Sequence, residues 1–191
     1  MKSVVTGAES LPSADTAAGL TIRDVHERHA DFVWRTLQRL GVRSMDLEDQ
    51  MQEVFIVAHR RLSSFDGKSA LGTWLFGICL RVAAAHRRRA HVRRERAASD
   101  TEESFVLESN EDPERASIER ETREELEELL GTLDLEKRAV FVMFEVKGQT
   151  APEIADVMGT PVGTVYSRLA AARAELTKAA ERRRMRERRS S

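Results

Sequence analysis

Apolar residues recur every three or four positions through several segments of the chain, which is the spacing of one buried helix face. In the first half, this pattern predicts helices over residues 21–40 and 46–62. A loop rich in Ser, Thr and Gly is expected over residues 63–73. A third helix is expected to begin at the end of this loop and to continue to residue 96.

The second half shows the same helical spacing, interrupted at Gly131. Helices are expected over residues 116–130 and 135–147, and two more within residues 147–178. Aromatic residues make up only 5% of the chain, whereas Ala, Leu, Glu and Arg, which favour helix, are abundant. We therefore expect an all-α protein.

The most informative local pattern lies in the two helices of residues 147–178. Thr150 and Glu153 match a helix-capping box, and Gly159 suits the left-handed residue that ends a helix. The second helix then opens at Pro161 and carries polar and basic residues on its outer face. A short helix, a Gly turn and a longer helix predict a helix-turn-helix that reads the DNA major groove. An ordinary helical hairpin is the alternative.

Charge is strongly segregated along the chain, although the net charge is only −1. Residues 81–96 hold seven Arg and one Glu, a net of +6, and they continue a predicted helix. Residues 100–128 hold thirteen Asp or Glu against three Arg, a net of −10. The basic helix is a candidate track for DNA phosphates, with a solvated surface as the alternative. The acidic segment cannot bind DNA.

These patterns divide the chain into two small helical domains joined by a flexible acidic linker. Residues 1–20 are expected to be a disordered tail and residues 181–191 a basic tail that frays. The N-terminal domain is expected over residues 21–96 and the C-terminal domain over residues 116–180. Residues 97–115 form the expected linker.

Two further surfaces of the N-terminal half have alternative interpretations. The polar residues near Asp49 and Gln52 form either a solvated helix face or a docking surface for a protein. Phe65, in an otherwise polar loop, either plugs the core or stacks on an unpaired base. Small residues between Arg81 and Arg88 would let a phosphate backbone approach closely.

Several kinds of chemistry are not supported by the composition. The single cysteine, Cys79, excludes an internal disulfide and a thiolate zinc site, and its apolar neighbours indicate burial. His26 and His29 have no third metal ligand nearby, so we expect no metal and no cofactor. No run of about 18 apolar residues would span a membrane, and the first 20 residues lack the pattern of a signal peptide. A cytoplasmic protein without catalytic activity is expected.

Segments in both halves of the chain resemble those of a known family. Residues 126–176 look like the promoter-binding C-terminal domain of extracytoplasmic-function (ECF) sigma factors, in the sigma-70 superfamily, most specifically at residues 161–169. Residues 49–55 resemble the segment of these proteins that docks on core RNA polymerase. Residues 65–69 and 73–75 resemble their promoter-melting loop and the start of the following helix.

The resemblance implies a role for each of these surfaces, in an initiation factor that binds core RNA polymerase and promoter DNA and is held by a cognate anti-sigma factor. The residues implied in polymerase binding are Asp49, Gln52, Glu53 and Phe55. Those implied at the melted −10 element are Phe65, Asp66, Gly67, Lys68, Ser69, Trp74, Arg81, Arg87 and Arg88. Those implied at the double-stranded −35 element are Thr164, Tyr166, Ser167, Arg168 and Arg173.

Three positions depart from the family pattern. Arg81 and Ala85 stand where the family usually has Asn and Asp in the −10-reading helix, and Ala171 stands where it often has a basic residue. All three changes fall on surfaces that face DNA, so the resemblance leaves the promoter sequence open.

Two other functions are compatible with the sequence. A stand-alone helix-turn-helix regulator would need a dimer surface and a palindromic site, but no heptad pattern or extra dimerisation helix is evident. An RNA-binding accessory protein using residues 81–96 would leave the helix-turn-helix unexplained.

Overall fold

The structure, a computed structural model, describes residues 20–96 and 125–190, and all regular elements in these two ranges are helical. This confirms the predicted all-α class. The expected tail and linker, residues 1–20 and 97–115, lie outside the described residues except for Leu20. The N-terminal half contains α1 (Ile22–Arg39), η1 (Ser44–Asp46), α2 (Leu47–Arg61), η2 (Leu62–Ser64) and α3 (Leu71–Arg96). The C-terminal half contains a helix at residues 125–131, α5 (Leu135–Phe141), η3 (Val142–Val146), α6 (Ala151–Met158) and α7 (Val162–Ser190).

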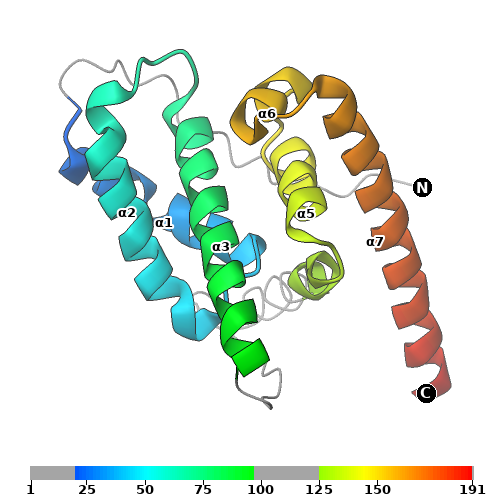
Figure 1. Ribbon diagram of the computed structural model, residues 1–191. Coiled ribbons are helices and arrows are strands. Elements are labelled where there is room, and N and C mark those ends of the chain that lie inside the picture. Colours follow the sequence, from blue (N-terminus) through cyan, green and yellow to red (C-terminus); the bar gives the residue numbers. More distant parts are fainter. Residues whose placement is uncertain (1–19, 97–124, 191) are drawn as a thin grey trace, which may run out of the picture.

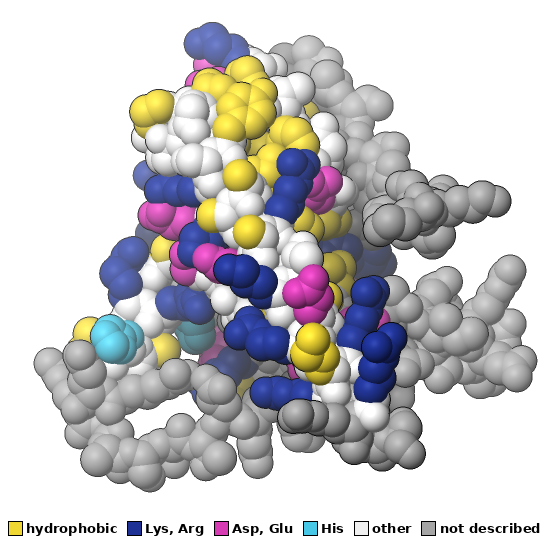
Figure 2. Space-filling view, turned by 90° about the vertical axis from the view of Figure 1, so that its right-hand side faces the viewer, with side chains coloured by type: hydrophobic (Ala, Val, Ile, Leu, Met, Phe, Trp, Pro, Cys, Tyr) yellow, Lys and Arg dark blue, Asp and Glu magenta, His cyan; other side chains and the backbone are white. Residues whose placement is uncertain are grey.

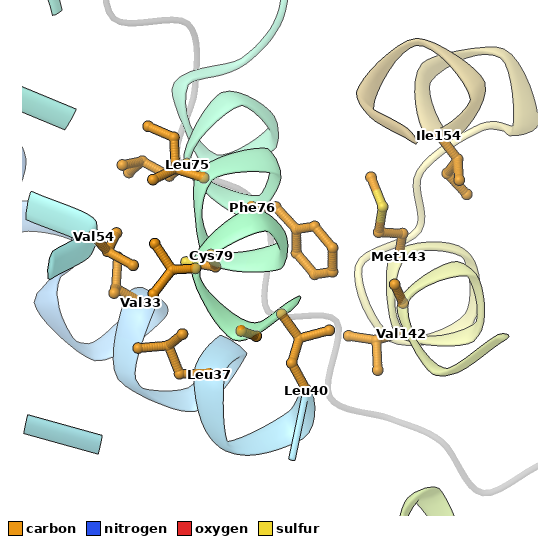
Figure 3. Close-up of a cluster of buried hydrophobic side chains, with 14 of the residues drawn as sticks. Val33, Leu37, Leu40, Val54, Leu75, Phe76, Cys79, Val142, Met143 and Ile154 are labelled. Atoms are coloured by element: carbon orange, nitrogen blue, oxygen red, sulfur yellow. The ribbon is translucent and has the colours of Figure 1, made fainter. Parts of the chain in front are cut away.

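The N-terminal half is a bundle in which α1, α2 and α3 pack on one another. Val33 and Leu37 of α1 and Leu75 of α3 are completely buried, and Figure 3 shows them grouped with Val54 of α2. Cys79 belongs to the same group and is also completely buried. Burial raises the pKa of the Cys79 thiol, so this cysteine serves packing, as the sequence predicts.

The C-terminal half contains the predicted helix-turn-helix. The backbone N–H and the hydroxyl of Thr150 both donate to the Glu153 carboxylate, at 2.8 and 2.7 Å, at the start of α6. Gly159 ends α6 in the left-handed conformation, with φ of 62°. Helix α7 then begins at Val162, and its Val165 and Leu169 are buried against the rest of this half.

Helix α7 is longer than the sequence predicts. It continues to Ser190, through the residues expected to form the basic tail. Arg183 contributes to this extension because its Nη1 lies 3.0 Å from Glu128 and 3.7 Å from Glu125, which belong to the helix at residues 125–131.

The two halves share one hydrophobic core. Figure 1 shows α3 between the α1–α2 pair on one side and α5 and α6 on the other, with α7 outermost. Phe76 of α3, 1% exposed, projects toward Val142 and Met143 of η3, both completely buried. Helical periodicity identifies each buried face but not which helix covers it, so the sequence could not foresee this contact between the halves.

The capping box gives a testable prediction for folding. Hydrogen bonds from Thr150 lower the pKa of Glu153 from its ordinary value of 4.5. Its carboxylate therefore contributes stability above pH 4.5, and this contribution is lost as the pH falls through the lowered pKa of the folded state. We expect Glu153→Ala to reduce the free energy of unfolding at pH 7 by about 0.3–1.5 kcal/mol, and the difference from wild type to shrink in acid.

Urea unfolding at several pH values measures this difference. Asp156→Ala is the matched control, because Asp156 is an exposed carboxylate of the same helix outside the capping box. A Glu153→Ala deficit that does not shrink anywhere on the acid side of neutral pH would contradict the prediction.

Candidate nucleic-acid interface

The outer face of α7 presents the predicted −35-reading side chains to solvent. Tyr166 is 56% exposed although it is aromatic, and Ser167 is exposed beside it. Thr164 is half-buried at the first turn. The helical period places the apolar side of α7 inward, so these three polar groups necessarily point away from the core.

The two predicted −35-reading arginines are paired with acidic residues of α5 and η3. Arg168 forms an ion pair with Glu136 of α5, and Arg173 donates to Glu145 of η3 through Nε at 2.8 Å. The Arg173 guanidinium also lies 5.7 Å from the centre of the Phe144 ring. These contacts join α7 to acidic and aromatic residues of α5 and η3.

The exposed face of α7 also includes small residues, of which the sequence singles out only Ala171. Ala170 and Ala174 are exposed and follow Ser167 at helical spacing, and Ala171 is half-exposed. Their positions could have been found from the 3.6-residue period, counted from the buried Leu169. They leave room for a nucleic acid to approach the backbone of the helix.

Basic side chains continue along α7 beyond the helix-turn-helix. Figure 2 looks onto the side of the molecule formed by α7 and shows Lys and Arg side chains concentrated on this face, with acidic groups among them. Lys178, Arg182, Arg184 and Arg188 are exposed members of this series. The molecule therefore has a predominantly basic surface adjoining its helix-turn-helix.

On α2, the structure brings three of the four predicted polymerase-binding residues to the surface. Asp49, Gln52 and Glu53 are all exposed, at positions that form one side of the helix. Phe55 instead points inward: it is 8% exposed, and its ring centre lies 4.6 Å from that of His26. Ile56, 39% exposed, adds an apolar group to the outer face of α2.

The loop between α2 and α3 has a buried aromatic base and a polar tip. Phe65 is 8% exposed, and its ring centre lies 5.2 Å from that of Trp74, so it plugs the core. Asp66, Gly67, Lys68 and Ser69 are exposed. Lys68 closes the tip through its backbone N–H, 3.1 Å from Asp66 Oδ1, and its Nζ, 2.7 Å from Oδ2. This pair lowers the pKa of Asp66 and raises that of Lys68.

Helix α3 carries the basic residues predicted to approach the −10 element. Arg81, Arg87 and Arg88 are exposed. Partial burial, and to a smaller extent the charge of Arg61, lowers the pKa of Arg81. Gly77, one turn before Arg81 on the same face, is buried.

Residues 20–96 and 125–190 contain no group of three His, Cys, Asp or Glu side chains that could hold a metal ion. Across the same residues, no helix has the length and apolar character needed to span a membrane.

Comparison with protein families matches the two halves separately. Residues 25–93 match the family model for Sigma-70 region 2. Residues 123–176 match the family model for Sigma-70, region 4. The two matches correspond to the α1–α3 bundle and to the half that contains the helix-turn-helix.

Relatives of similar length match across both halves. The chain is 32% identical over 152 residues to the RNA polymerase sigma factor NccH of Alcaligenes xylosoxydans xylosoxydans, covering 79% of this chain and 82% of NccH. It is 36% identical over 138 residues to the ECF RNA polymerase sigma-E factor of Escherichia coli K12, covering 69% of this chain and 72% of that protein.

Solved structures share the fold. The sigma factor RpoE of Bartonella quintana, in complex with the anti-sigma factor NepR, aligns over 83% of this chain and 98% of its own, with a TM-score of 0.66 and 18% identity. CnrH, in complex with the cytosolic domain of CnrY, aligns over 87% and 92%, with a TM-score of 0.59 and 24% identity. Sigma-70 regions 2 and 4 are both matched, one in each half, and the chain covers most of the length of its relatives. This chain therefore belongs to the ECF sigma factors of the sigma-70 superfamily.

Proposed function

We propose that this sigma factor uses three separate helical surfaces to start transcription: α2 for core RNA polymerase, α3 with its preceding loop for the −10 element, and α7 for the −35 element. The main support is that one chain presents a helix-turn-helix with exposed Tyr166 and Ser167 and, in its other half, a helix with exposed arginines. Core RNA polymerase performs nucleotide transfer, and this chain is a non-catalytic subunit that acts in the cytoplasm.

The polymerase-binding surface proposed on α2 is the exposed group of Asp49, Gln52 and Glu53. These side chains are available without any rearrangement of the bundle. Phe55 supports this surface from below, because its burial against His26 holds α2 on α1.

At the −35 element, we propose that Tyr166 and Ser167 meet base edges while Arg168 and Arg173 exchange their carboxylate partners for DNA. The Arg173 side chain is 54% exposed, and exposed ion pairs contribute only about 0–1 kcal/mol, so the exchange at Arg173 costs little. Ala171 stands where the family often has a basic residue, and we propose it as a position that affects the −35 preference of this chain.

At the −10 element, the polar loop tip and the arginines of α3 are proposed to act together. Asp66, Gly67, Lys68 and Ser69 supply exposed polar groups to an unpaired base, and Trp74 lies directly behind Phe65. Arg81, Arg87 and Arg88 supply positive charge for the adjoining phosphates.

A cognate anti-sigma factor is a further proposed partner, since RpoE was solved in complex with the anti-sigma factor NepR. The shared fold supports a comparable complex here.

The proposed function is tested by adding the purified chain to core RNA polymerase and selecting promoters from a random library. Enrichment of sequences with two separated elements, and run-off transcripts that require the chain, are the expected results. Tight binding of the chain alone to a palindromic duplex, with no effect on polymerase, would support a stand-alone regulator instead.

Gln52→Ala is expected to weaken binding to core RNA polymerase several-fold without changing the thermal unfolding of the chain, because the Gln52 side chain is exposed. A pull-down titration with core polymerase measures this. Glu27→Ala on α1, also exposed, is the control. Equal affinity of the two variants would remove Gln52 from the polymerase-binding surface.

Arg168→Ala is expected to weaken promoter use through the −35 element by about 1–3 kcal/mol, the range for a base-specific contact. Glu136→Ala frees the same guanidinium and is expected to retain promoter use. Transcription from promoters with intact and scrambled −35 elements measures both variants. Equal losses in the two would instead give Arg168 a role in orienting α7.

A further inference from the structure

Helix α7 continues beyond the part of the chain that matches Sigma-70, region 4. The match ends at residue 176, whereas α7 continues to Ser190. This basic extension, residues 177–190, adds about four helical turns. Ala179 on its inner side is 7% exposed, and the Arg183 side chain, one turn later, is 30% exposed. The extension is therefore packed along one side and open on the other.

The basic extension carries a high positive charge. It holds seven Lys or Arg against two Glu, a net of +5. Lys178, Arg182, Arg184 and Arg188 are exposed, and Figure 2 shows Lys and Arg side chains gathered on the side of the molecule formed by α7. Arg184 and Arg188 are four residues apart, as are Lys178 and Arg182, so their like charges repel along the helix. An anionic partner would stabilise this extension.

Carboxylates from an earlier part of the chain already contact the extension at one point. Arg183 Nη1 lies 3.0 Å from Glu128 Oε2 and 3.7 Å from Glu125 Oε1, in the helix at residues 125–131. The chain that leads into this helix lies outside the described residues. Its residues 100–114, the acidic stretch, hold seven Asp or Glu and no Lys or Arg, a net of −7. The acidic stretch and the basic extension therefore have opposite charges of similar size.

The acidic stretch is within reach of every exposed cation of the extension. The extension is about 15 Å long from Lys178 to Arg188, at about 1.5 Å per residue. The eleven residues from 114 to 125 can span up to about 36 Å, at about 3.3 Å per residue. Because the stretch is tethered at Glu125, its local concentration at the extension is of about millimolar order. A separate anionic molecule has no such advantage.

Two other interactions compete for these groups. Arg184 lies about 26 Å along α7 from Ser167, whereas the major groove is only about 12 Å wide, so the extension lies beyond the groove that Ser167 would enter. The arginines of α3 are also within reach of the acidic stretch. However, Arg89 of α3 lies 3.5 Å from Gln50 Oε1, and only the extension has a contact with the chain that follows the stretch. The charges therefore favour the extension as the site of the acidic stretch.

We propose that the acidic stretch binds the basic extension of α7, so that their opposite charges are neutralised within the chain. An extension with a net charge of +5 attracts DNA of any sequence, because every phosphate attracts Lys and Arg. With the acidic stretch bound, this attraction is reduced, and the face that carries Tyr166 and Ser167 contributes a larger share of DNA binding. The inference does not depend on the proposed function, since it concerns duplexes of any sequence.

A nitroxide spin label at Ser109→Cys tests the contact in the full chain, because the native Cys79 is buried. At about 0.05 M salt, the label is expected to broaden the amide signals of residues 178–188. At about 0.5 M salt, where charges are screened, the broadening is expected to decrease. Absence of broadening at low salt, or broadening on the arginines of α3 instead, overturns the proposal.

Binding of a random-sequence duplex measures the consequence for DNA. Neutralising three acids of the stretch is expected to raise the affinity several-fold, in the variant Glu108→Gln, Glu111→Gln, Asp112→Asn. The matched control removes the same types of carboxylate from exposed positions of α1 and α2, in the variant Glu27→Gln, Asp31→Asn, Glu48→Gln. The control is expected to have a smaller effect, and equal effects of the two variants overturn the proposal.

Removing the cations separates contact within the chain from direct contact with DNA. The variant is Arg182→Gln, Arg184→Gln, Arg188→Gln, at three exposed positions. In the wild-type background it is expected to change duplex affinity little, because the acids already neutralise these arginines. In the acid-neutralised background it is expected to abolish the gain in affinity. Equal losses in the two backgrounds mean that DNA itself occupies the extension, and they overturn the proposal.

Discussion

Burial of α3 on two opposite sides is the constraint on which the rest of the structure depends. Leu75 and Cys79 face α1 and α2, whereas Phe76 faces the C-terminal half. A helix covered on both sides cannot keep charged groups in its first turns. Its arginines accordingly begin at Arg81 and lie on the exposed side, while Val82 and Ala83 remain buried. The positions of the proposed DNA contacts on α3 thus follow from its packing.

At the other surfaces, too, burial separates the residues that hold a helix in place from the residues that a partner can reach. Phe55 and Phe65 are apolar members of blocks that resemble functional segments, yet both are buried, and polar neighbours form the accessible surface. On α7, Arg168 and Arg173 pair with acids while Tyr166 extends into solvent. Each block therefore combines residues that hold a helix in place with residues that can meet a partner.

Much of the fold was predictable because it depends on local interactions. The capping box at Thr150, the left-handed Gly159 and the helical spacing of α7 are properties of neighbouring residues, and the structure contains all three. The extent of α7 was not predicted, because Arg183 is held by Glu125 and Glu128, more than 50 residues earlier in the chain. The partners of Arg168 and Arg173 are likewise distant in sequence.

The sequence by itself determined the helical class, the helix-turn-helix, the segregation of charge and the family resemblance, since these depend on residue type and spacing. Only the tertiary structure decided that Phe65 plugs the core, that the buried Arg138 guanidinium lies against Gly41, and that Gln149 donates a hydrogen bond to Thr73. The physical reason is that these contacts join residues far apart in the chain, and a periodic apolar face specifies that it must be covered without specifying by what.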